Sequence, residues 1–325
     1  MRFTPCMRLR NTLVLAVAAG LLAAPASAQT YPSRDIRFVC AFPAGSGADV
    51  LVRYFANGVQ KVANNTVIVE NKSGAAGLIA AEYVARSKPD GYTVFVHSAT
   101  GVSNIPALYK KPPIDAATAM EVAGTINRQP FMIVVDVKSP YKTLVQLTEA
   151  MKKKGDKATY GASATTGTVV GEIYKARTGI KAVEVNYKTA SDSLNDQQSG
   201  RLDYASMDPQ YSLAQQREGR LRILAVSSGE RLQASPELPT MREQGVDIDV
   251  TGWFAAMVPS GTPAPVKAKI HEWFVKVVST PETKAFLNQF GGDPLVLSLE
   301  QAQARLLRDI DAWKEYARIA KIVPQ

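Results

Sequence analysis

The residues best suited to bind a ligand form one short loop, Pro43-Ala44-Gly45-Ser46-Gly47-Ala48-Asp49. An apolar run at residues 36–42 leads into it and has the length and the β-branched and aromatic content of a buried strand. Beyond the loop, apolar residues recur on one helical face: Leu51, Phe55, Val59 and Val62. A strand, a glycine-containing turn and a helix direct backbone N–H groups and a positive helix-dipole end to one point, where an anion binds without a basic side chain. The loop therefore predicts half of a carboxylate-binding site, in which Asp49 supports the first turn of the helix.

The sequence offers few groups for catalysis. The two histidines, His97 and His271, and Cys40, the one cysteine after the leader, lack the spacing of a metal site. Ser163 lies in Gly-Ala-Ser-Ala-Thr, which lacks the second glycine of a nucleophile elbow. Gly45-Ser46-Gly47 is not followed by the third glycine of a dinucleotide-binding fingerprint. We predict a binding protein rather than an enzyme, with no catalytic residue, no cofactor and no metal.

Two other functions stay open at this point. A periplasmic serine hydrolase of carboxylic esters or amides would use Ser46 or Ser163 as its nucleophile and His97 as its base. A ligand-sensing co-receptor would bind the same carboxylate and present its loaded form to a membrane sensor kinase. His97 follows a strand of the buried type near the predicted site, so it is either a ligand contact or a structural histidine.

Strands alternate with helices along most of the chain. Further apolar strands are predicted at residues 66–70 and 92–96, and both end, like the first, in small and hydroxyl residues. This alternation predicts βαβ units and a mostly parallel sheet, whose ligands bind beyond the carboxyl ends of the strands. The pattern recurs over residues 131–226. The last block is predicted as a strand at residues 253–258 followed by three helices, at about residues 264–278, 282–289 and 299–319.

The first 28 residues are organised as a secretory signal peptide. Arginines precede an apolar segment at residues 13–24, and Ala26-Ser27-Ala28 is a cleavage pattern. Removal of this leader takes away three arginines and no acidic residue, so the formal net charge falls from +9 to +6. The remaining basic residues are scattered and match no nucleic-acid-binding motif, so we expect no nucleic-acid partner. We expect a periplasmic protein, since no later run approaches the ~20 apolar residues of a transmembrane helix.

Eight short motifs, in order, give the chain a resemblance to a known family. It resembles the periplasmic receptors of tripartite tricarboxylate transporters, the Bug or TctC-type solute-binding proteins, over essentially its whole mature length. The motifs are Tyr31-Pro32-Ser33-Arg34-Asp35-Ile36-Arg37, Phe42-Pro43-Ala44-Gly45 with Asp49, Val69-Glu70-Asn71 with Gly74-Ala75-Ala76-Gly77, Pro89-Asp90-Gly91-Tyr92-Thr93, Tyr160-Gly161-Ala162-Ser163, Tyr187-Lys188, Leu238-Pro239-Thr240 with Glu243-Gln244-Gly245, and Pro259-Ser260-Gly261-Thr262-Pro263.

The resemblance implies an α/β, two-lobed periplasmic-binding-protein fold of type II, with two doubly wound mixed sheets and a ligand cleft between the lobes. Residues 29–126 plus 250–325 would form lobe 1, and residues 127–249 would form lobe 2. One wall of the site would hold Phe42, Ala44, Gly45, Ser46, Ser98 and Thr100. The other wall would hold Ser163, Thr165, Thr166, Tyr187 and Asp208.

The implied function is capture of a small organic carboxylate by lobe closure, and its delivery to the integral-membrane subunits of a transporter. We expect the receptor to be a monomer. Three departures from the usual family pattern leave the identity of the carboxylate open: Ser46 stands for a second glycine, Leu78 for an asparagine, and Thr189-Ala190 for a glycine pair.

Overall fold

Two mixed β-sheets organise residues 31–324, the part of the chain that this computed structural model describes. The first sheet has six strands in the order β11-β4-β10-β3-β1-β2, and the second has five in the order β7-β6-β8-β5-β9. We call the six-stranded sheet with its covering helices the first lobe, and the five-stranded sheet with its covering helices the second lobe. Both belong to one compact unit that begins at Arg34. The predicted signal peptide, residues 1–28, lies outside the described residues.

The first lobe is built from the two ends of this unit. Strand β1 pairs in parallel with β2 and β3, whereas β10 runs antiparallel to β3 and β4. Its strands are β1 (Ile36–Cys40), β2 (Val67–Asn71), β3 (Thr93–Ser98), β4 (Met120–Pro130), β10 (Thr251–Pro259) and β11 (Asp293–Pro294). Its helices are α2 (Gly47–Ala63), the 3-10 turn η1 (Ala75–Gly77), α3 (Leu78–Ala85), α4 (Ala99–Ser103), α5 (Ile105–Leu108), α10 (Ala264–Val278), α11 (Pro281–Gln289) and α12 (Leu299–Ile319).

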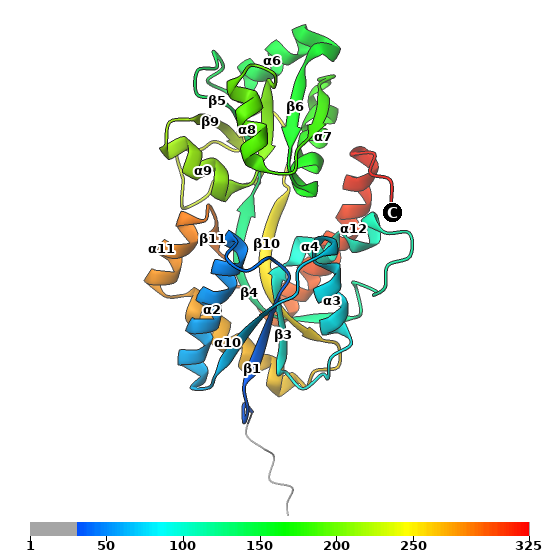
Figure 1. Cartoon of the computed structure of the whole chain (residues 1–325), viewed down its shortest axis with the longest axis vertical. Coiled ribbons are helices and arrows are strands. Elements are labelled where there is room, and N and C mark those ends of the chain that lie inside the picture. Colours follow the sequence, from blue (N-terminus) through cyan, green and yellow to red (C-terminus); the bar gives the residue numbers. More distant parts are fainter. Residues whose placement is uncertain (1–30, 325) are drawn as a thin grey trace, which may run out of the picture. The chain divides into compact units, whose positions relative to one another are not determined.

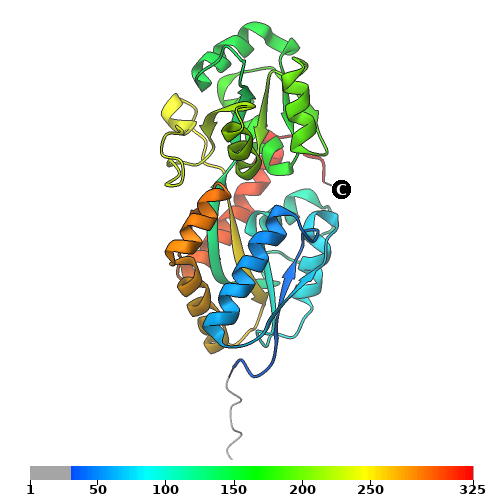
Figure 2. The same ribbon diagram turned by 60° about the vertical axis from the view of Figure 1, so that its left-hand side comes forward.

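Alternation along β1 sends neighbouring side chains to opposite faces of the first sheet. Phe38 packs toward α2 and α10, where the Phe274 ring lies 5.8 Å from Phe38 and 5.9 Å from Phe55. Val39 faces the opposite core, which includes residues of α3, α4 and α12. Figure 2 shows α2 beside the C-terminal helices α10 and α11 on one side of this lobe. The predicted apolar face of α2 is buried except for Val62, near the end of the helix, which is 39% exposed.

The second lobe repeats the strand–turn–helix arrangement. Strand β6 lies parallel to β7 and β8, and β5 lies antiparallel to β8 and β9. Its strands are β5 (Met132–Asp136), β6 (Thr159–Ala162), β7 (Val183–Asn186), β8 (Tyr204–Met207) and β9 (Leu221–Val226). Its helices are α6 (Leu144–Lys154), the 3-10 turn η2 (Gly155–Lys157), α7 (Thr165–Thr178), α8 (Ala190–Gln198), α9 (Pro209–Arg217) and the 3-10 turn η3 (Arg242–Gln244).

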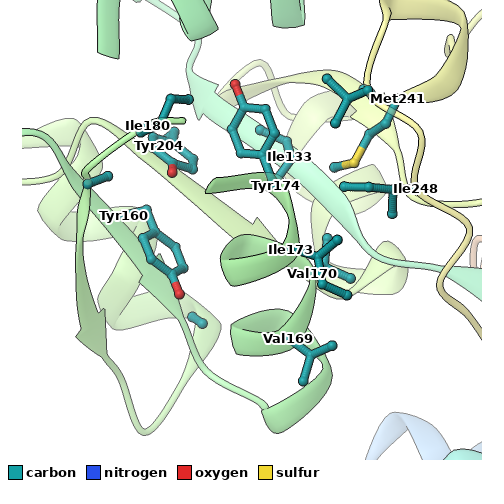
Figure 3. Close-up of a cluster of buried hydrophobic side chains, with 14 of the residues drawn as sticks. Ile133, Tyr160, Val169, Val170, Ile173, Tyr174, Ile180, Tyr204, Met241 and Ile248 are labelled. Atoms are coloured by element: carbon teal, nitrogen blue, oxygen red, sulfur yellow. The ribbon is translucent and has the colours of Figure 1, made fainter. Parts of the chain in front are cut away.

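Helix α7 is fixed against the second sheet by aliphatic and tyrosine side chains (Figure 3). The Tyr204 ring is stacked on Tyr160 at 5.5 Å and meets Tyr174 edge-on at 5.8 Å. The Tyr160 hydroxyl donates to Glu172 at 2.7 Å, and the Tyr174 hydroxyl is hydrogen-bonded to Thr148 at 2.6 Å. Since buried hydroxyl groups need partners, these bonds fix the second half of α7 against the sheet and against Thr148 of α6.

Three segments join the lobes. The chain passes from β4 to β5 and, after β9, returns through β10 (Figure 1). Helix α12 contributes Leu306 and Ile310 to the core of the first lobe, and Trp313 and Ala317 to a core of the second. The apolar side chains of α12 therefore pack in the cores of both lobes. The division at residues 126/127 and 249/250 stays a prediction, and β4 extends across the first of these positions.

Candidate ligand-binding site

The loop after β1 is held by the carboxylate of Asp49. Ser46 is the N-cap of α2, and its hydroxyl oxygen accepts from the Asp49 N–H at 3.3 Å. The buried Asp49 carboxylate accepts from the Gly45 N–H at 2.8 Å, Arg53 Nε at 2.9 Å and Asn71 Nδ2 at 2.7 Å. Burial opposes ionisation, but the hydrogen bonds from Arg53, Asn71 and Gly45 outweigh it and lower the pKa of Asp49. Asp49 supports the helix start, as predicted, and ties the loop to the end of β2.

These bonds decide which loop N–H groups can meet a ligand. The Gly45 N–H is occupied by Asp49, and the Ser46 N–H donates to the Pro43 carbonyl at 3.2 Å. Within the described residues, the N–H groups of Gly47 and Ala48 donate to no hydrogen-bond acceptor. An α-helix leaves its first N–H groups without partners inside the helix, so these two are the loop N–H groups that remain available to an anion.

A second helix N-terminus comes from the other lobe. Helix α7 begins at Thr165, and its N-cap residue is Ala164, which has no side chain able to cap it. The first N–H with a helical partner is that of Thr168, which donates to the Ala164 carbonyl at 3.0 Å. The N–H groups of the first turn, residues 165–167, are therefore free of a side-chain cap and present the positive end of the α7 dipole.

Both helix N-termini contribute to one cavity of about 350 Å³. This volume lies near the lower end of the range for small-molecule sites, roughly 300–1,000 Å³. Its walls combine apolar side chains, neutral polar groups and one carboxylate, and they come from the two lobes: Phe42, Ala48, Leu51, Ser98, Gln129, Phe131, Ala164, Thr166, Asp208, Gln210, Phe254 and Phe290. The rings of Phe42 and Phe254 lie 6.0 Å apart, and Gln210 of α9 packs across the cavity against Gly47.

Asp208 is the one charged side chain among these lining residues. It is the N-cap of α9, and its Oδ1 accepts from the Tyr211 N–H at 2.9 Å. Burial raises the pKa of Asp208 above its usual value, although the N–H groups at the start of α9 act in the opposite direction.

The buried His97 side chain packs against Phe42, which lines the cavity. Its ring lies 4.7 Å from that of Phe42 and 4.8 Å from that of Phe95, and burial lowers the pKa of His97 to about 3, so it is neutral at pH 7. It is not among the residues that line the cavity. No hydrogen bond links it to Ser46 or Ser163 within residues 31–324, so the contacts there do not form the nucleophile–base pair of a serine hydrolase.

The predicted site residues separate into several places. Phe42, Ser98, Thr166 and Asp208 line the cavity. Thr100 lines a neighbouring cavity of about 260 Å³ together with Thr166, whereas Ser163 and Thr165 line one of about 380 Å³ beside Tyr109. Four predicted residues line none of these three cavities: Ala44, Gly45, Ser46 and Tyr187. Ala44 and Gly45 are exposed, and the Tyr187 hydroxyl donates to Asp196 at 2.9 Å.

Sequence reasoning missed several lining residues. Gln210 directly follows the Asp208-Pro209 strand end and had a positional signal, since it belongs to the same loop as a predicted site residue. Four other lining residues had no signal in the sequence, because strand pairing and lobe packing bring them to the cavity from distant parts of the chain. They are Gln129, Phe131, Phe254 and Phe290.

Residues 31–324 hold neither a candidate metal cluster nor a helix able to span a membrane. No group of three or more histidine, cysteine, aspartate or glutamate side chains gathers there in a way that could hold a metal ion. Among the helices of residues 31–324, none has the length and apolar character needed to cross a bilayer.

Two sheets of mixed direction, and a cavity lined from both lobes, define an α/β binding protein of the periplasmic-binding-protein type. Residues 51–322 match the family described as "Tripartite tricarboxylate transporter family receptor", TctC, and the chain belongs to this family. The loop at residues 43–49 precedes the matched residues. A relative encoded in the gbd 5' region of Cupriavidus necator, a UPF0065 protein, is 31% identical over 291 residues, with 87% of each chain covered.

Solved structures agree with this assignment. The periplasmic binding protein BugD has a TM-score of 0.75 and 29% identity, with 91% of this chain and 100% of BugD covered. The R. palustris protein Rpa4515, solved with adipate, has a TM-score of 0.79 and 27% identity, with 91% of this chain and 100% of that protein covered. The predicted family and fold class are confirmed. The family and BugD are binding receptors rather than enzymes, in agreement with the predicted class.

Proposed function

We propose that this chain is a periplasmic solute-binding protein that captures a small organic carboxylate by lobe closure and delivers it to the membrane subunits of a tripartite tricarboxylate-type transporter. The supporting observation is the pair of helix N-termini at one cavity, α2 from the first lobe and α7 from the second. Each is equivalent to roughly half a positive charge. None of the residues lining the cavity is a lysine, arginine or histidine, so the donors for an anion are main-chain N–H groups and neutral side chains such as those of Ser98 and Thr166.

In this proposal one carboxylate lies between the two helix ends. It accepts from the N–H groups of Gly47 and Ala48 on one side and from those of residues 165–167 on the other. Charge-assisted hydrogen bonds of this kind contribute about 1.5–3 kcal/mol each. The adipate of the R. palustris relative supports a carboxylate as the class of ligand.

Closure follows from the division of these donors between the lobes. A ligand that contacts both helix ends does so only when the lobes are together, so binding shifts the equilibrium from open to closed. The membrane subunits then bind the loaded, closed receptor, and the family description as transporter receptor supports such partners. The predicted leader and the periplasmic location of BugD support export to the periplasm. We expect the receptor to act as a monomer.

A variant pair at Ala164 tests the site. Ala164→Asp would place a carboxylate where it caps α7, occupying its N–H groups and repelling an anionic ligand. Ala164→Ser would supply a neutral cap at the same exposed position. Both caps should stabilise the ligand-free protein by about 0.5–2 kcal/mol. Only Ala164→Asp should lower carboxylate affinity at least tenfold.

The assay is thermal unfolding of residues 29–325 against a panel of carboxylates, followed by calorimetry of the ligands found. A ligand at 100 times its dissociation constant adds about 2.7 kcal/mol to the free energy of unfolding. Small-angle scattering should show a smaller radius of gyration with the ligand than without it. Undiminished affinity in Ala164→Asp would exclude the proposed clamp, and identical scattering curves at saturation would exclude closure.

A further inference from the structure

Beyond the two helix ends, half of the residues that line the cavity are phenylalanines. Phe42 and Phe254 come from the first sheet and its loop, Phe131 from the start of the second sheet, and Phe290 from the end of α11. Phe42 is held in place by the buried His97 ring behind it and by Phe254 at 6.0 Å. Rings that line a small cavity favour a flat apolar partner, which packs against them in offset or edge-to-face contact. The ligand body that fits these walls is an aromatic ring.

The cavity has positive helix ends at one place in its wall and a carboxylate at another. The positive helix ends of α2 and α7 suffice for one carboxylate, and the only charged side chain in the lining is itself a carboxylate, Asp208. The dipole of α9 is already matched by this residue, whose Oδ1 accepts from the Tyr211 N–H. A second carboxylate on the ligand would therefore share a small, partly dehydrated space with Asp208 and find no side-chain cation in the lining. Like charges in such an environment repel strongly and reject the wrong partner.

We propose that the ligand is a monocarboxylate with an aromatic body and an N–H or O–H donor, and that Asp208 selects it over dicarboxylates. This inference rests on the proposed function and narrows its substrate class. A donor on the ligand would form a charge-assisted hydrogen bond with the Asp208 carboxylate. Burial already raises the pKa of Asp208, so a donor that stabilises its ionised form is favoured, whereas a second anion adds to an existing cost. The relative solved with adipate binds a dicarboxylate, so this selection would distinguish the present chain from it.

The test is isothermal titration calorimetry with ligands that differ at one ring position. The probes are benzoate, 3- and 4-aminobenzoate, isophthalate and terephthalate, with adipate as an aliphatic dicarboxylate. At pH 7.5 the native protein should bind at least one aminobenzoate more tightly than benzoate, and at least tenfold more tightly than either aromatic dicarboxylate or adipate.

Asp208→Asn is the matched variant, because asparagine is as good an N-cap as aspartate and differs from it only in charge and one donor group. The variant should bind the corresponding dicarboxylate about tenfold more tightly than the native protein does, and the preferred aminobenzoate about tenfold more weakly. Asp192→Asn, an exposed position in the first turn of α8 outside the cavity, is the control and should leave both affinities unchanged. Thermal melts of both variants verify folding.

The outcomes separate this inference from the proposed function. If adipate, isophthalate or terephthalate binds the native protein more tightly than the aminobenzoates, the selection by Asp208 is wrong while the carboxylate receptor stands. An unchanged preference in Asp208→Asn overturns the role of Asp208 in the same way. If no carboxylate in this series or in the wider panel binds, the proposed function fails and the inference fails with it.

Discussion

Replacing Asp293 by alanine should loosen the junction between the two lobes. Asp293 belongs to β11 of the first sheet and is 1% exposed. Its carboxylate oxygens accept from the backbone N–H groups of Gln233 at 3.0 Å and Ala234 at 3.1 Å, and Arg128 lies 3.2 Å away. Gln233 and Ala234 follow β9, in a segment that packs on the second lobe through Leu232. The carboxylate therefore connects two lobes that are otherwise joined by β4, the return to β10, and α12.

The expected loss can be worked out from these three contacts. Each is a charge-assisted hydrogen bond of about 1.5–3 kcal/mol, but the native carboxylate also loses its hydration on burial. Removal of one partner from a buried ion pair typically costs about 3–5 kcal/mol, because the other partner stays buried without compensation. The Arg128 side chain is 23% exposed and keeps Glu230 at 3.5 Å, so the loss here should lie near the lower end, about 3 kcal/mol. That is a large part of a total stability of about 5–15 kcal/mol. Asp293→Asn should lose less, since its amide oxygen still accepts one N–H group.

Urea unfolding at pH 7.5 measures the change. Asp247→Ala is the control, since its carboxylate pairs with Arg242 at 3.0 Å on an exposed part of the surface and should contribute little. Calorimetry on Asp293→Ala should also show weaker ligand binding, because the contact holds the lobes together. If Asp293→Ala unfolds at the same urea concentration as Asp247→Ala and binds ligand as the native protein does, the contact does not join the lobes energetically.

Two other substitutions test the loop and its support. The pKa of Asp49 is lowered in the folded protein, so its ionised form stabilises the fold above the usual pKa of an aspartate, and this stabilisation is lost as the pH falls through the lowered value. Urea unfolding between pH 7 and pH 3 should show a smaller loss of stability for Asp49→Asn than for the native protein, and parallel curves would refute this role. Gly101→Ala would bring a Cβ to 2.6 Å from Nε2 of His97, whose ring is held between Phe42 and Phe95, at a cost of about 1–3 kcal/mol in thermal unfolding. A melting temperature equal to that of the native protein would show that the ring moves freely.

Local sequence patterns predicted most helices and strands. They failed for β4, which is a strand because of its pairing with neighbouring strands and not because of its own apolar pattern. The sequence predicts helices at about residues 264–278 and 299–319, and α10 and α12 have these bounds. Strand β4 was not predicted, since residues 120–130 include Gly124, Thr125 and Asn127, which break an apolar pattern. Its position between β10 and β11 makes it a strand, and Gly124 is needed because Phe274 of α10 packs directly on its backbone.

The candidate cavity could be predicted as far as the loop after β1, but the individual N–H groups that are free to bind a ligand could not, and the site itself stays a prediction. The strand–turn–helix pattern placed an anion site after β1, and Phe42 and Ala48 do line the cavity. The sequence does not reveal that the Asp49 carboxylate accepts from the Gly45 N–H, because that depends on the Ser46 cap and on Asn71, which ends the next strand, β2. Residues such as Phe290 reach the cavity only through tertiary packing.

The proposed clamp of main-chain groups would suit a receptor that must also release its ligand. A buried lysine or arginine at the site would leave an uncompensated charge whenever the cavity is empty, and this would bias the lobes strongly toward the open or the filled state. The N–H groups of Gly47 and Ala48 cost much less to leave to water. Their positions are set in advance by Asp49, which keeps the loop fixed whether or not a ligand is present. Under the proposed function, the difference in free energy between open and closed lobes would then stay small enough for one ligand carboxylate to decide it.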